Sequence, residues 1–95
     1  MSKTFKLVTI FCEAVLESPL ITVLEEMGIT GYTVGDCRGR GTHGLRSGRW
    51  AASANIRIEV MCEHELSLEL ARLLNAKYDL DYGLLIFSHP VDVLN

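Results

Sequence analysis

The 95-residue chain has few cysteines and no cysteine pair at metal-binding spacing. Cys12, Cys37 and Cys62 are odd in number and far apart, which argues against both a disulfide framework and a zinc site. The three histidines form neither an HExxH motif nor any other metal-ligand spacing. The sequence therefore predicts reduced thiols, no metal and no resident cofactor.

The chain also lacks long apolar runs and an excess of positive charge. No segment approaches the ~20 apolar residues of a membrane span, and none resembles a signal peptide. We therefore expect a cytoplasmic protein without direct membrane insertion. Nine Lys and Arg against twelve Asp and Glu give a net charge of -3. Broad nucleic-acid binding needs a basic face, so nucleic acid is not an expected partner.

Motifs of the common catalytic sites are missing as well. There is no nucleophile elbow, no HRD-type loop and no P-loop lysine. Paired carboxylates such as Glu25 with Glu26 fall on predicted helix surfaces or ends, where a solvated face is the common explanation. The whole chain, residues 1–95, is predicted to form one domain, because it is too short for two cores. The sequence does not predict an enzyme.

Hydrophobic periodicity predicts four strands and two helices. Residues Thr4 to Cys12 alternate as a strand whose two faces are both largely apolar. A helix follows, with Ser18 as N-cap and Pro19 as first residue, or with a start one turn earlier at Glu13, and Gly28 ends it. Two strands are predicted over residues 31–37 and 56–62, and a second helix over residues 65–78. The last strand covers residues 83–88, and Pro90 is predicted to stop it.

The order β-α-β-β-α-β predicts an α+β, ferredoxin-like fold, with a four-stranded antiparallel sheet and both helices on one face. The first and last strands carry apolar residues on both faces, for example Val8 with Ile10 and Leu85 with Phe87. An exposed apolar sheet face is usually buried by association. We therefore expect a homo-oligomer with closed symmetry.

The stretch from Gly31 to Trp50 holds six of the eight glycines and four of the six arginines. No acidic residue occurs between Asp36 and Glu59. Exposed backbone N–H groups and arginine forks suit phosphate or carboxylate, so this stretch from Gly31 to Trp50 is predicted to be an anion-binding loop. A solvated loop without a ligand is the alternative.

Residues 39–44 (GRGTHG) match the GxGxxG pattern of dinucleotide-binding folds. That fingerprint requires a helix beginning at its third glycine within a βαβ unit. Here Ser47, Gly48 and a further strand follow instead. A dinucleotide fingerprint is therefore rejected, although the glycines still allow a close approach of the backbone to a ligand.

Residues 31–41 (GYTVGDCRGRG) and 57–60 (RIEV) resemble the PII signalling superfamily, in which a GMTV-type strand leads into a GxG turn and a long T-loop. With the order of elements, the resemblance covers nearly the whole chain. It implies a compact homotrimer that binds adenine nucleotides in clefts between subunits. The T-loop of this chain would be the segment of about residues 38–55.

The resemblance also implies a set of ligand-binding residues. Thr33 would lie near the adenine, with Glu59 and Met61 beside the base in the third strand. The remaining residues would surround the phosphates or ribose: Gly39 and Gly41 at the phosphate-facing turn, Tyr82 and Gly83 in a second loop, and Arg46, Arg40 and Arg49 from the T-loop.

Departures from the family pattern indicate a branch. Residues 42–44 (THG) stand where nitrogen-regulating members carry arginine, glutamine and lysine, and 79–83 (DLDYG) replace a TGxxGDGK-type loop. Signalling through 2-oxoglutarate is therefore not expected. Residues 31–34, 46–47 and 81–83 look more like PII-like proteins of inorganic-carbon metabolism. That branch implies ADP or AMP, with ATP or cAMP as further candidates, bicarbonate as second ligand, and a transporter or carboxysome-linked protein target.

The predicted function is a regulatory switch in which a nucleotide orders the T-loop and changes the surface shown to a partner. Three alternatives remain open. They are a small nucleotide-hydrolysing enzyme, a trimeric module of the copper-tolerance type that shares this architecture, and a plain oligomerisation module.

Overall fold

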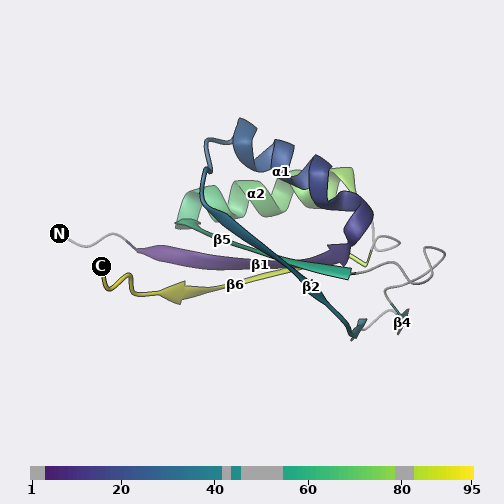
Figure 1. Ribbon diagram of the computed structural model, residues 1–95. Helices are drawn as coiled ribbons and strands as arrows, with labels where there is room; N and C mark the ends of the chain where they lie inside the picture. Colours follow the sequence, from purple (N-terminus) through teal and green to yellow (C-terminus); the bar gives the residue numbers. More distant parts are fainter. Residues whose placement is uncertain (1–3, 42–43, 46–54, 79–82) are drawn as a thin grey trace.

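A four-stranded antiparallel sheet covered on one face by two helices organises the chain (Figure 1). The computed structural model describes residues 4–41, 44–45, 55–78 and 83–95. Its elements are β1 (Phe5–Glu13), the 3-10 helix η1 (Ala14–Leu16), α1 (Glu17–Glu26), β2 (Tyr32–Cys37), β3 (Arg40–Gly41), β4 (Gly44–Leu45), β5 (Asn55–Glu63), α2 (His64–Lys77) and β6 (Leu85–Val91). The predicted α+β, ferredoxin-like fold is confirmed.

The sheet has the strand order β2-β5-β1-β6, so the two longest strands lie at its centre. β1 pairs with β5 along its whole length, from Phe5 opposite Glu63 to Glu13 opposite Asn55. β2 is shorter, and its ladder with β5 ends where Tyr32 lies opposite Val60. The sheet therefore has one ragged end, which is also the end where β6 finishes (Figure 1).

The core lies between the sheet and the helices. Ile10 and Ile58 are opposite each other on the helix-facing side and are fully buried. They meet α1 and α2 through the buried leucines of the two apolar helix faces, Leu20, Leu24, Leu70 and Leu74. Each such side chain contributes roughly 1.5–3 kcal/mol. Neither helix of the described part is long and apolar enough to cross a lipid bilayer.

Gly28 terminates helix α1 as the residue after its C-cap Met27, as predicted. The Gly28 N–H donates to the Glu25 carbonyl at 3.0 Å, and the Ile29 N–H donates to the Leu24 carbonyl at 2.9 Å. These two bonds form a Schellman motif, which requires a left-handed residue, and Gly28 has φ of 80°. The motif turns the chain from α1 toward the start of β2.

The predicted start of α1 at Ser18 is wrong. The N-cap is Leu16, and the turn Ala14–Leu16 precedes it, in agreement with the alternative start near Glu13. Ser18 lies within the first turn instead, where its carbonyl accepts a hydrogen bond from Thr22 Oγ1 at 3.1 Å. Pro19 also fits there, because the first backbone N–H groups of a helix have no intrahelical acceptor.

The prediction that Pro90 stops the last strand is also wrong. β6 continues to Val91, with Pro90 opposite Lys6 of β1. β6 is an edge strand, where the missing N–H of a proline can face away from the sheet. Within the predicted T-loop the structure adds a short ladder, in which Arg40 pairs with Leu45 in β3 and β4.

The face of the sheet away from the helices is rich in apolar side chains. Met61, Leu85 and Phe87 remain 47%, 43% and 45% exposed there. Phe87 stacks on Phe11 with ring centroids 6.1 Å apart. We call this surface the open face; its burial by other copies of the chain stays a prediction.

Candidate functional site

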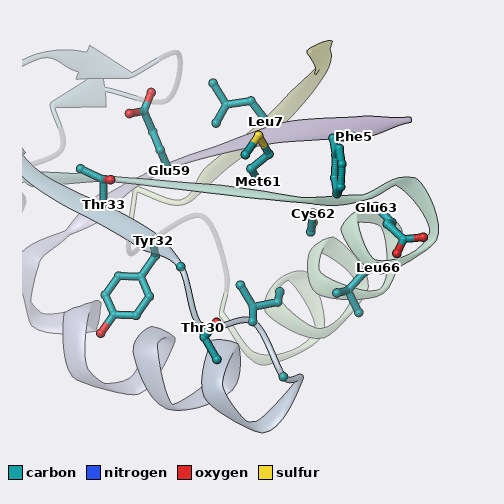
Figure 2. A pocket seen from close by; sticks show the side chains of 13 residues that line it. Phe5, Leu7, Thr30, Tyr32, Thr33, Glu59, Met61, Cys62, Glu63 and Leu66 are labelled. Carbon is teal, nitrogen blue, oxygen red and sulfur yellow. The ribbon is translucent and has the colours of Figure 1, made fainter. Parts of the chain in front are cut away.

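A hollow of about 610 Å³ lies at the ragged end of the sheet, where β2 begins (Figure 2). Its walls come from β1, the turn between α1 and β2, the start of β2, the end of β5 and the start of α2. The lining residues are Phe5, Leu7, Gly28, Ile29, Thr30, Gly31, Tyr32, Thr33, Glu59, Met61, Cys62, Glu63 and Leu66. Three of the predicted ligand-binding residues, Thr33, Glu59 and Met61, are therefore in one place.

Strand pairing explains why these three side chains meet. Thr33 of β2 lies directly opposite Glu59 of β5, so both project from the same face of the sheet. Met61 follows two residues later in β5 and shares that face, opposite Leu7 of β1. Figure 2 shows Thr33, Glu59 and Met61 on the side away from the helices, whereas Tyr32 points toward the helices. A hydroxyl, a carboxylate and a thioether thus line one wall.

The hollow is apolar and acidic rather than basic. Among the described residues that line it, the charged side chains are the carboxylates of Glu59 and Glu63. Cys62 is buried, and this burial raises the pKa of its thiol, so the thiol stays neutral. The hollow therefore suits a flat, uncharged group with hydrogen-bond donors, and it disfavours a phosphate.

The other predicted residues lie elsewhere. Gly39 follows the far end of β2, and Arg40 with Gly41 forms β3 beyond it. The strand from Thr33 to Cys37 alone spans about 13 Å at 3.3 Å per residue, and Gly39 is two residues farther along the chain. In Figure 1, β2 leads away from the ragged end, and the β4 label lies beyond its far end. The predicted base and phosphate positions of one chain are therefore separated.

The second predicted loop is described only in part. Gly83 has φ of 66° and precedes Leu84, which is buried and lies directly before β6. Tyr82 lies outside the described residues, as do Arg46 and Arg49. Their predicted roles stay predictions.

Sequence reasoning missed much of the hollow's wall. Phe5, Tyr32 and Leu66 line it but were assigned no binding role. Two features of the sequence could have pointed to this wall. The alternation of the first strand places Leu7 on the same face as Thr9 and Phe11, and Gly28 marks the turn between the first helix and the second strand. In the described part of the chain, no three His, Cys, Asp or Glu side chains are close enough to share a metal ion.

Comparison with known proteins gives consistent matches. Residues 5–94 match the family described as Nitrogen regulatory protein P-II. A PII-like signalling protein from Thermus thermophilus is 34% identical, with a TM-score of 0.75, over 94% of this chain and 88% of that chain.

Two structures of CPII, a nitrogen regulatory PII-like protein from Thiomonas intermedia, have the same fold. The one bound to ADP, AMP and bicarbonate is 22% identical, with a TM-score of 0.79, over 97% of this chain and 94% of that chain. The one bound to ADP and bicarbonate is 24% identical, also with a TM-score of 0.79, over 95% and 88%. From the family match over nearly its whole length, the chain belongs to the nitrogen regulatory protein P-II family.

Proposed function

We propose that this chain is a PII-like signal-transduction protein that binds an adenine nucleotide in clefts between the subunits of a homotrimer. ADP and AMP are the first candidates, and ATP and cAMP are further ones. The observation that carries the proposal is the convergence of Thr33, Glu59 and Met61 on one wall of the hollow, in a chain of this family.

The chemistry of that wall suits adenine. The Glu59 carboxylate can accept a hydrogen bond from the exocyclic amino group, and the Thr33 hydroxyl can donate or accept one. The Met61 thioether is polarisable and packs well on a flat ring. A base with an oxygen at the amino position would place that oxygen against the carboxylate, which disfavours guanine.

The charges support opposite ends for the base and the phosphates. Glu59 and Glu63 repel a phosphate from the hollow, whereas the arginines of residues 38–49 attract one. Of these arginines, Arg38 and Arg40 are described, and both follow the far end of β2, away from the hollow of the same chain. A nucleotide that uses both groups would therefore take its base from one copy and its phosphates from a neighbour. This composite arrangement supports a cleft between subunits.

The open face supports the assembly. Leu85, Phe87 and Met61 expose apolar surface on one side of the sheet, and such a patch is costly on a single chain in water. Packing these faces together around a threefold axis would bury them and bring neighbouring chains edge to edge. The trimer is part of the proposal.

The regulatory output would be an ordering of the T-loop. A nucleotide, with bicarbonate as second ligand, would favour the loop state that it contacts and so change the surface offered to a target. The CPII structures with ADP, AMP and bicarbonate support this choice of ligands. We infer regulation of inorganic-carbon metabolism, with a transporter or a carboxysome-linked protein as the target.

Calorimetry with AMP, ADP, ATP, cAMP and adenosine, each with and without bicarbonate, tests the proposal. We expect at least one nucleotide to bind with a dissociation constant in the micromolar range. If none of them binds, the proposal is refuted. Turnover of ATP by the pure protein would favour the nucleotide-hydrolysing alternative.

The predicted phosphate role of Arg46 has a matched control on the same chain. Arg46→Ala should lower the affinity for nucleotides by about 10- to 100-fold, because a charged hydrogen bond contributes about 1.5–3 kcal/mol. The affinity for adenosine, which has no phosphate, should not change. Arg72→Ala should change neither, because Arg72 is exposed on α2 and pairs with Glu69 at 2.7 Å. Equal weakening of adenosine and nucleotides by Arg46→Ala would remove Arg46 from the phosphate site.

A further inference from the structure

Two polar side chains are buried at the end of the sheet where the predicted T-loop begins. Asn55, the first residue of β5, is 7% exposed and lies directly opposite Glu13 of β1, which is 3% exposed. Because Ile56 faces the core, the alternation of β5 directs Asn55 toward the open face. The Asn55 Oδ1 atom is buried, and no hydrogen-bond donor of the described chain reaches it. A buried oxygen without a donor is costly, and a ligand with an N–H or O–H would satisfy it.

A cation that pairs with none of the described residues stands beside Asn55. Arg57 follows two residues later in β5, so its side chain also projects from the open face, about 7 Å along the strand. Its guanidinium forms no hydrogen bond or ion pair with the described chain. Directly opposite Arg57 is Gly35 of β2, where a Cβ would have no contact within 4 Å. Arg57 therefore borders an open space that the missing side chain of Gly35 leaves on β2.

We call the surface formed by Gly35, Arg57, Asn55 and Glu13 the polar corner. Its chemistry differs between its two ends. The Arg57 guanidinium offers paired N–H donors that match a carboxylate, whereas Asn55 Oδ1 and the acidic Glu13 side chain present acceptors. A matching ligand is therefore an anion at one end and an O–H donor at the other. Bicarbonate combines these two parts in a small planar ion, while nitrate and acetate lack the O–H.

The polar corner is compatible with both regions that the proposed function uses. It lies on β2, β5 and β1, whereas the exposed Leu85 and Phe87 lie in β6 at one edge of the sheet. Packing of the β6 side against another copy therefore does not require the corner to be covered. The base wall is one row away, because Thr33 and Glu59 are each two residues from a member of the corner on the same strand. One chain can hold the base and bicarbonate next to each other.

We propose that the polar corner binds bicarbonate, with its carboxylate oxygens on the Arg57 guanidinium and its hydroxyl donating to Asn55 Oδ1. This rests on the proposed function, which includes bicarbonate as second ligand but assigns it no residues. The negative charge of Glu13, directly opposite Asn55, disfavours a phosphate, which carries more negative charge than bicarbonate. Arg57 selects an anion, and Asn55 selects one that carries an O–H.

Calorimetric titration of bicarbonate and of acetate into the full-length chain, with and without saturating ADP, tests the two contacts separately. Arg57→Gln should lower the affinity for both anions about 10-fold or more, because both lose a charge-assisted hydrogen bond to their carboxylate. Asn55→Leu should lower the affinity for bicarbonate about 2- to 10-fold and leave that for acetate unchanged, because acetate has no hydroxyl to donate. The control variants Arg72→Gln and Asn75→Leu, at exposed positions of α2, should change neither affinity.

Urea unfolding without bicarbonate gives a second readout. Asn55→Leu should not lower the free energy of unfolding, because the oxygen that it removes has no donor, and a clear loss of stability would count against the proposal. Equal bicarbonate affinities of the parent chain and Arg57→Gln, or equal losses of bicarbonate and acetate in Asn55→Leu, would overturn it. A chain that binds ADP but shows none of these differences refutes only the polar corner. A chain that binds bicarbonate as expected but no nucleotide refutes the proposed function and leaves the polar corner in place.

Discussion

The open face offers a direct test of assembly, because two of the exposed leucines among the described residues lie in contrasting places. Leu85 is 43% exposed on the open face, and Leu68 is 54% exposed on α2, which covers the other face. Replacing either with alanine removes the same atoms. Only the Leu85→Ala substitution should weaken the trimer.

The magnitude follows from the exposure. Fully burying a leucine side chain is worth roughly 1.5–3 kcal/mol, so burying the remaining 43% of Leu85 is worth about 1 kcal/mol per subunit. Three subunits lose about 3 kcal/mol per trimer, which lowers the association constant about 100-fold. Leu68→Ala should leave that constant unchanged, because no packing of the open faces would cover this residue.

Sedimentation velocity over a dilution series measures both association constants. Thermal unfolding at a high protein concentration serves as the folding control, since both leucines are half-exposed and their loss should leave the fold intact. The reasoning is refuted if both variants dissociate at the same concentration as the parent chain. A larger effect from Leu68→Ala would place the interface on the helices instead.

Three other predictions concern the hollow and its surroundings. In urea unfolding, the Gly28→Ala variant should have a free energy of unfolding about 1–2 kcal/mol lower than that of Gly31→Ala. Both sites have room for a Cβ, but of the two only Gly28 has a left-handed φ. Equal stabilities of the two variants would contradict this backbone strain. Thr33→Val should weaken ADP binding about 2- to 10-fold, from one hydrogen bond worth about 0.5–1.5 kcal/mol, while Thr22→Val on α1 should not change the calorimetric affinity. Burial raises the pKa of the Cys62 thiol above its ordinary value of 9.0 and so favours the neutral form in the folded state. The stability that the neutral Cys62 thiol contributes should be present at neutral pH and should be lost as the pH rises past 9.0. The free energy of unfolding in urea should therefore fall less steeply above this pH in Cys62→Ala than in the parent chain.

The strands could be predicted from the sequence because the period of two is a local property of the backbone. The predicted strand Thr4 to Cys12 differs from β1 by one residue at each end. The Gly28 terminus was equally readable, since only glycine tolerates that φ at little cost. Pro90 was misread because its effect depends on whether the strand lies at an edge of the sheet, and this follows from the pairing order rather than from local sequence.

The hollow could be predicted only in part. Resemblance to a family identified Thr33, Glu59 and Met61, and their common face then followed from strand register. Phe5 and Leu66 are 61 residues apart in sequence, and both line the hollow at the end of the sheet where β2 stops short of β5. No periodic pattern in the sequence encodes the relative lengths of two paired strands, so Phe5 and Leu66 could not be predicted as lining residues.

The separation of Thr33 from Gly39 along β2 has a genetic consequence. If each ligand is held by halves of two chains, a chain with a defective base half and a chain with a defective phosphate half are each inactive alone. When the two kinds of chain are mixed, every trimer that contains both has one subunit interface at which an intact base half meets an intact phosphate half. A cell expressing both defective alleles would therefore recover up to one working site per mixed ring, and two mutations in the same half would recover none.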